Sequence, residues 1–250
     1  MPELILGITG DCNLDCGFCF EDRDGELTQE QIQQYVSAFI GDHVEIGGGE
    51  PFLRKDLVHI VKQIIAQGKT VQIATNGTIM REDFMRLDEG TRSKVSLQVS
   101  LHAGTPETYR EITSYDMFDQ VVENLRGFVL SYVTGLSCAM YAENIGELPE
   151  ILSISYELGL PIRVGLVFPN DRFKGRLLTP EQVRELGEQL LVEKTVSEGL
   201  VESSLLRPNI CPVLSGVYGL EKKGACPAEN GHKLYVDPSG MEHRCEFLVS

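Results

Sequence analysis

The chain has 250 residues, a formal net charge of −15 and an isoelectric point near 4.8. This acidity disfavours nucleic acid as a partner, because such binding depends on Lys and Arg side chains that neutralise phosphates. No apolar run approaches the ~20 residues that a membrane-spanning helix needs, so we expect a soluble, cytoplasmic protein without a membrane partner.

Strand-like and helix-like segments alternate along most of the chain. Strands are expected at residues 4–8, 43–47, 70–75, 94–101, 136–141 and 162–168. Helices are expected at residues 28–40, 57–68, 82–87, 117–132 and 148–158, and from residue 179 onward. Thr28 and Thr179 have the sequence context of helix N-caps, and Pro180 suits a first helical position. Repeats of this kind predict an α/β fold whose parallel sheet curls towards a barrel, with sites at the C-terminal strand ends.

Three cysteines lie within eight residues directly after the first predicted strand: Cys12, Cys16 and Cys19. Iron–sulfur clusters are usually held by four Cys thiolates, so a loop with three leaves one iron open to another ligand. A zinc site with a fourth ligand elsewhere is the alternative, since such spacings also suit Zn²⁺. The odd total of seven cysteines argues against a disulfide framework and favours thiols that are reduced or bound to metal.

A second motif, Gly48-Gly49-Glu50-Pro51, follows the second predicted strand. With the C-x3-C-x2-C loop and its aromatic Phe18, it makes the chain resemble the radical S-adenosylmethionine (SAM) enzymes over about residues 4–200. The resemblance implies a partial (β/α)6 TIM-type barrel and an oxygen-sensitive protein. It also implies a [4Fe–4S] cluster on the three thiols, with the amino and carboxylate groups of SAM on the fourth iron.

The resemblance assigns further residues to SAM. Glu50, placed by a flexible Gly48-Gly49 turn, is expected to accept a hydrogen bond from the SAM ammonium group. Phe18 is expected either to lie against adenine or simply to pack in the core. The remaining candidates are Asn76, after the predicted strand 70–75, and Ser100 and His102, at the end of the predicted strand 94–101. Arg110 resembles a helix arginine of the family that often pairs with the SAM carboxylate. Parity places Ser100 and His102 on one face, although His102 is equally well read as a satisfied loop histidine.

A second cysteine constellation lies near the C-terminus. Residues 233–236 and 242–244 flank the turn sequence Asp-Pro-Ser-Gly, which predicts a β-hairpin between Cys226 and Cys245. This resembles the opening of SPASM and Twitch domains and implies one auxiliary iron–sulfur cluster on Cys211, Cys226 and Cys245. The fourth ligand would be open or non-Cys, such as His232, His243 or Glu246, and a zinc site or unligated thiols are the alternatives.

The domains expected from this organisation are a barrel over residues 1–205 and a SPASM/Twitch-like auxiliary region over 206–250. The resemblance implies a radical SAM oxidoreductase of the maturase type, which forms a 5′-deoxyadenosyl radical and abstracts hydrogen from a peptide or protein substrate. An alternative is a dehydrogenase or rearrangement enzyme for a small molecule or cofactor. Another is a non-catalytic iron–sulfur or zinc protein. An enzyme of this family also needs an electron donor, such as ferredoxin or flavodoxin. Cys138, alone in an apolar strand, is expected to be a buried small hydrophobe.

Overall fold

The computed structural model describes residues 3–21, 23–168, 173, 175–197, 200–203, 205, 217–218 and 233–243. Its strands are β1 Glu3–Thr9, β2 His43–Gly48, β3 Thr70–Thr75, β4 Val95–Ser100, β5 Val133–Met140, β6 Ile162–Leu166, β7 Val201–Ser203, β8 Lys233–Val236 and β9 Glu242–His243. Its α-helices are α1 Gln29–Ala38, α2 Leu57–Ala66, α3 Glu82–Met85, α4 Glu89–Arg92, α5 Pro106–Thr113, α6 Phe118–Val129, α7 Leu148–Leu158 and α8 Pro180–Val196. Two 3₁₀ turns, η1 Pro51–Leu53 and η2 Ile145–Glu147, complete the elements. No helix in this part of the chain is long and apolar enough to cross a membrane.

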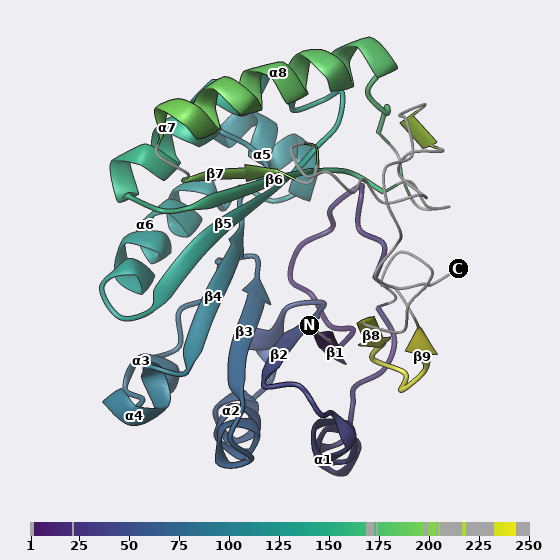
Figure 1. Cartoon of the computed structure of the whole chain (residues 1–250), viewed down its shortest axis with the longest axis vertical. Coiled ribbons are helices and arrows are strands. Elements are labelled where there is room, and N and C mark those ends of the chain that lie inside the picture. Colours follow the sequence, from purple (N-terminus) through teal and green to yellow (C-terminus); the bar gives the residue numbers. More distant parts are fainter. Residues whose placement is uncertain are drawn as a thin grey trace.

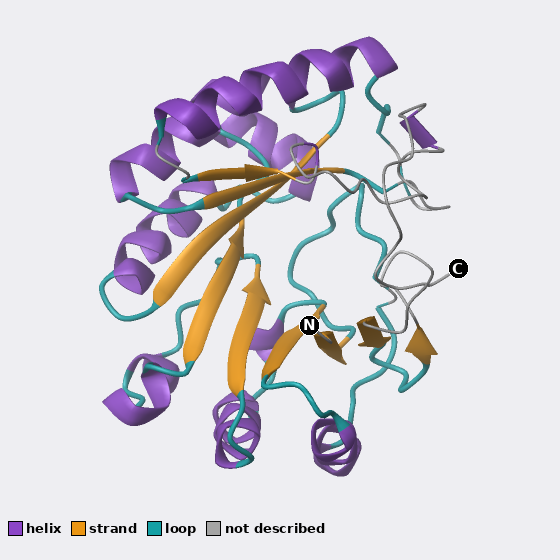
Figure 2. Cartoon of the chain, viewed as in Figure 1, coloured by secondary structure: helices purple, strands orange, loops and turns teal. Residues whose placement is uncertain are grey.

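The strands form one sheet in the order β7-β6-β5-β4-β3-β2-β1-β8-β9, parallel throughout except for the β8–β9 pair. The sheet follows an arc with helices along its outer face (Figures 1 and 2). The outward side chains of β1 (Leu4, Leu6 and Ile8) are at most 1% exposed. Strand β4 alternates between buried and half-buried positions, as expected when one face meets the helices and the other a cavity. The predicted α/β partial barrel is confirmed.

Local capping chemistry sets the helix boundaries. The hydroxyl of Thr28 accepts the Gln31 N–H at 3.2 Å, and the Gln31 side chain accepts the Thr28 N–H at 2.8 Å. Thr179 and Gln182 repeat this reciprocal pair at the start of α8, where Pro180 occupies the first turn. Both predicted N-caps are confirmed, each as part of a capping box, because such pairs depend only on residues three apart.

Helix α5 was not predicted as an element, although the sequence carried its signals. Thr105 is the N-cap, its hydroxyl accepting the Thr108 N–H at 3.4 Å, and Pro106 occupies the first turn. Tyr109 and Ile112 are buried on one side of the helix, and Ser114 ends it with a left-handed φ of 66°. The helix is only eight residues long, so its apolar periodicity is short and easily missed.

The predicted C-terminal hairpin is confirmed as β8 and β9. Asp237 Oδ1 accepts the N–H groups of Ser239 and Met241, each at 2.9 Å, which fixes the turn. Strand β8 also pairs in parallel with β1, from Glu3 opposite Lys233 onward. The sheet therefore continues across the predicted 205/206 boundary. The predicted auxiliary ligands Cys211, Cys226 and Cys245 lie outside the described residues, as do His232 and Glu246.

Candidate functional site

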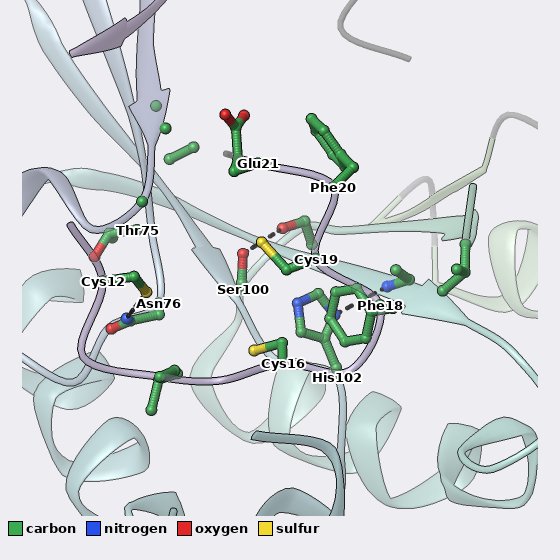
Figure 3. Close-up of a pocket in the computed structure, with 18 of the residues that line it drawn as sticks. Cys12, Cys16, Phe18, Cys19, Phe20, Glu21, Thr75, Asn76, Ser100 and His102 are labelled. Atoms are coloured by element: carbon green, nitrogen blue, oxygen red, sulfur yellow. Dashed lines mark hydrogen bonds between the residues drawn. The ribbon is translucent and has the colours of Figure 1, made fainter. Parts of the chain in front are cut away.

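A cavity of about 420 Å³ lies at the C-terminal ends of the parallel strands (Figure 3). Small residues on the inner face of the sheet leave this space open, among them Gly47 on β2, Ala74 on β3 and Ser137 on β5. The three N-terminal cysteines line the same cavity. Sites of parallel α/β sheets form at this end, because strand ends and the following loops converge there.

The loop that carries the cysteines is held by helix α5. The Asp15 N–H donates to the Thr113 carbonyl at 3.0 Å, and the Gly17 N–H donates to the Ile112 carbonyl at 3.2 Å. These carbonyls belong to the last turn of α5, where no intrahelical N–H is available to them. The helix therefore fixes the loop on both sides of Cys16.

The Gly48-Gly49 pair joins the end of β2 to the root of the cysteine loop. The N–H groups of Gly49 and Glu50 donate to the carbonyls of Thr9 and Asp11, each at 2.7 Å. A Cβ on Gly48 would lie 2.4 Å from the Thr9 oxygen, and one on Gly49 would lie 2.1 Å from the Asp11 oxygen. Gly48 also has φ of +105°. The glycines are thus needed for close backbone approach, rather than for the flexible turn expected from the sequence.

The Glu50 side chain is 0% exposed and does not line the cavity. Its carboxylate accepts hydrogen bonds from the Phe52 N–H at 2.9 Å, the Thr75 hydroxyl at 2.8 Å and the Asn76 N–H at 2.7 Å. Burial raises the pKa of this carboxyl to about 7. The carboxylate faces these protein donors, and its predicted contact with the SAM ammonium group stays a prediction. Its observed role is to hold the ends of β2 and β3 together.

Asn76 lies between this carboxylate and the first cysteine. Its side-chain amide donates to Asn13 Oδ1 at 2.9 Å and lies 3.8 Å from Cys12 Sγ (Figure 3). The side-chain oxygen Oδ1 of Asn76 accepts a hydrogen bond from the Thr78 hydroxyl at 2.6 Å. The structure therefore brings Asn76 to the cavity wall, where it positions Cys12.

The three thiols suit an iron–sulfur cluster. They are half-buried and free of disulfides, and burial raises the pKa of each, that of Cys16 to about 12. Within the described residues, no three His, Cys, Asp or Glu side chains converge on a single metal ion. A multi-iron cluster takes each thiolate on a different iron and so needs no such convergence. The donor set and the adjoining cavity therefore fit a cluster better than a zinc ion at this loop.

Phe18, Ser100 and His102 all line the cavity, as the sequence placed them. The rings of Phe18 and His102 meet edge to face with 4.7 Å between centroids. His102 Nδ1 accepts the Ala139 N–H at 3.0 Å, and burial lowers the pKa of the imidazole to about 4. The hydroxyl of Ser100 lies 3.4 Å from that of Ser137.

The structure places one predicted site residue away from the cavity and several unpredicted residues in the cavity wall. Arg110 is exposed on α5 and does not line the cavity, and its predicted contact with the SAM carboxylate stays a prediction. Glu21, Glu45 and Tyr235 do line it, and the Tyr235 hydroxyl donates to Glu21 at 2.5 Å. Glu45 could have been predicted, because it lies two residues from Gly47 on one strand and so on the same face of the sheet. Tyr235 could not, because it reaches the cavity only through the non-local pairing of β8 with β1. Cys138 is buried, as predicted.

Solved structures of other proteins share this fold. SuiB of Streptococcus suis bound to the precursor peptide SuiA has a TM-score of 0.77 at 15% identity, covering 99% of this chain and 60% of that chain. The enzyme anSMEcpe with bound AdoMet has a TM-score of 0.71 at 16% identity, covering 100% of this chain and 76% of that chain. At these identities the likeness concerns the fold.

Sequence comparisons identify the family. A probable GTP 3′,8-cyclase of Methanothermobacter marburgensis is 33% identical over 139 residues, 52% of this chain and 45% of the relative. One from Saccharolobus islandicus is 31% identical over 170 residues, 64% of this chain and 54% of the relative. The chain thus spans about half the length of these curated relatives. The family model of the radical SAM superfamily matches residues 6–154, which include the cysteine loop, the Gly-Gly-Glu-Pro motif and strands β2 to β5, and the chain therefore belongs to that superfamily.

Proposed function

We propose that this radical SAM enzyme modifies a peptide or protein by abstracting a hydrogen atom from it. When bound, the [4Fe–4S] cluster and SAM supply a 5′-deoxyadenosyl radical through one-electron reductive cleavage of SAM. Cys12, Cys16 and Cys19 would hold the cluster, since their thiols line the cavity. The protein's contribution is then to orient SAM and substrate and to exclude water from the reacting atoms.

The residues around the cavity have distinct roles in this proposal. The backbone of Gly48 and Gly49 lies on the cavity wall and would approach the methionine part of SAM without interference from side chains. Ser100 offers a hydroxyl to the SAM carboxylate or ribose. Leu166, Val167 and Phe168, at and just after the end of β6, line the cavity together with Phe18 and offer an apolar surface to adenine.

The charge of the cavity wall is the observation that favours a peptide or protein substrate over a nucleoside triphosphate. Its wall contains the carboxylates of Glu21 and Glu45 and, among the described residues, no Lys or Arg. Such a wall suits the sulfonium and ammonium groups of SAM and a neutral or cationic substrate. A nucleoside triphosphate would instead require cations to balance its phosphates. The fold supports the same choice, because the likeness to SuiB, whose structure holds a precursor peptide, extends over 99% of this chain.

A second candidate is a small-molecule reaction in cofactor biosynthesis. It is favoured by the 31–33% identity to probable GTP 3′,8-cyclases, which is higher than the identity to the peptide-binding structures. That identity lies in 52–64% of this chain, and the residues that select a substrate need not be among those matched.

The C-terminal region is proposed to bind an auxiliary iron–sulfur cluster through Cys211, Cys226 and Cys245, as a SPASM/Twitch-like unit over residues 206–250. The observed hairpin β8–β9, which lies between Cys226 and Cys245 in the sequence, supports this proposal. A ferredoxin or flavodoxin is proposed as the electron donor to the enzyme.

The substrate class is tested by 5′-deoxyadenosine release from anaerobic, reduced enzyme and SAM. GTP should neither raise the rate nor give a cyclised product. A size-fractionated extract of the organism that carries the gene should raise the rate, and protease treatment of the active fraction should abolish the increase. Stimulation by GTP, or by a protease-resistant small-molecule fraction, would replace this proposal with the second candidate.

A further inference from the structure

Tyr109 carries a buried hydroxyl that has no hydrogen-bond partner in the described part of the chain. The side chain is 2% exposed, and its ring packs against Phe118 with 6.0 Å between centroids. An unpartnered buried hydroxyl is destabilising, so native proteins rarely leave one without an acceptor. Tyr109 lines the cavity, so a group bound there is in a position to provide that acceptor.

The helix that carries Tyr109 is the one that holds the cysteine loop. The carbonyls of Ile112 and Thr113, one turn further along α5, accept the N–H groups of Gly17 and Asp15. The Thr113 hydroxyl in turn donates to the Tyr109 carbonyl at 2.8 Å. The tyrosine is therefore fixed relative to Cys16, which lies between the two bonded loop residues.

The surroundings keep the hydroxyl protonated and able to donate. Burial raises the pKa of Tyr109 most strongly, and the nearby Cys16, Cys12 and Glu50 raise it further, in that order. Of these neighbours, Glu50 is already hydrogen-bonded to Thr75 and to two backbone N–H groups. The cysteine sulfurs become anionic when they bind iron, and anionic sulfur accepts hydrogen bonds.

We propose that the Tyr109 hydroxyl donates a hydrogen bond to a sulfur of the cluster held by Cys12, Cys16 and Cys19, and thereby raises the reduction potential of that cluster. The inference rests on the cluster assignment in the proposed function. A donor to sulfur stabilises the electron that reduction adds, so its removal makes reduction harder. Tyr109 thus tunes the entry of an electron into the cluster, although it lies outside both the cysteine motif and the Gly-Gly-Glu-Pro motif.

The test compares wild-type enzyme with Tyr109→Phe, which keeps the ring and removes only the hydroxyl. Reductive titration of the SAM-free, anaerobic proteins, followed by electron paramagnetic resonance, should give Y109F a more negative midpoint potential at equal iron and sulfide content. Electron–nuclear double resonance in H₂O and D₂O should show the loss of one exchangeable proton coupled to the cluster. Tyr132→Phe is the control, because it removes a buried hydroxyl that donates to the Phe84 carbonyl, away from the cavity. It should leave both cluster signals unchanged.

Equal potentials and an unchanged exchangeable proton in Y109F would overturn the inference. So would a Y109F protein that fails to retain the cluster, because the three thiols and the ring remain in that variant and the role would then be structural. Wild-type protein that takes up no iron would contradict the proposed function itself. The iron content of the wild type therefore separates the two failures.

Discussion

The backbone N–H of Asn76 donates a 2.7 Å hydrogen bond to the carboxylate of Glu50, and this bond joins the end of β3 to the end of β2. The amide of the same Asn76 lies 3.8 Å from Cys12 Sγ. The Gly-Gly-Glu-Pro motif is therefore linked to the cysteine loop through two contacts of one residue. Through this link we expect a carboxylate outside the cavity wall to influence what binds within the cavity.

Glu50→Gln should lower the free energy of unfolding by about 2 kcal/mol and weaken SAM binding. The carboxylate accepts from three donors in the described part of the chain, namely Phe52 N–H, the Thr75 hydroxyl and Asn76 N–H. A glutamine would turn its own NH₂ group towards one of them. Urea unfolding and SAM titration measure the two effects, with Glu89→Gln as an exposed control that should change neither. Full SAM affinity in E50Q would contradict the positioning role.

His102 should make stability depend on pH. Its folded-state pKa of about 4 lies below the ordinary 6.5, so the neutral form stabilises the fold fully above pH 6.5. Stability should then fall as the pH drops from 6.5 towards 4, by up to roughly 3 kcal/mol. Protonation of Nδ1 would also break its bond to the Ala139 N–H.

His102→Asn is the matched variant for this pH dependence, because its side-chain oxygen can replace Nδ1 as an acceptor without titrating. Thermal unfolding between pH 4 and 7 should show a shallower slope for H102N than for wild type. Identical slopes would show that another group is responsible.

Tyr235→Phe should loosen the C-terminal hairpin from the barrel. The Tyr235 hydroxyl donates to Glu21 Oε2 at 2.5 Å, and both side chains are at least nine-tenths buried. Loss of this charge-assisted bond should cost about 1–3 kcal/mol and speed hydrogen exchange in residues 233–243. Tyr35→Phe loses the 3.2 Å bond to the Gly240 carbonyl and an interaction with Glu242 of the same hairpin, but it should have a smaller effect because Tyr35 is only half-buried and water can replace its hydroxyl. Equal effects would argue against a special role of the Tyr235–Glu21 bond.

Cys226→Ala should lower the iron content by about four per chain and leave the N-terminal cluster in place, if the auxiliary cluster has four irons. Iron and sulfide analysis after anaerobic reconstitution measures the loss. Cys138→Ala is the control, since this buried cysteine of β5 has no proposed ligand role. Unchanged iron in C226A would remove the auxiliary cluster from the account.

Local signals made much of the fold predictable. The Thr28 and Thr179 capping boxes depend on residues three apart, and the Asp237 turn depends on its own four residues. The pairing of β8 with β1 was not predictable, because it joins segments about 230 residues apart without a local marker. The direction of the Glu50 side chain was also hidden, since it depends on donors supplied by β3. The sequence thus predicted that the cysteine loop and the strand ends form the cavity, whereas tertiary contacts decide which side chains face it.

The most direct test of the central claim is the release of 5′-deoxyadenosine from SAM by the reduced, reconstituted protein, measured by liquid chromatography and mass spectrometry. Wild-type protein should release it, and Cys16→Ala should release none above the level of a protein-free control, because the cluster would lose a ligand. The folded state of C16A is checked by circular dichroism. Release by C16A equal to the wild type, or none from iron-loaded wild type, would contradict the account.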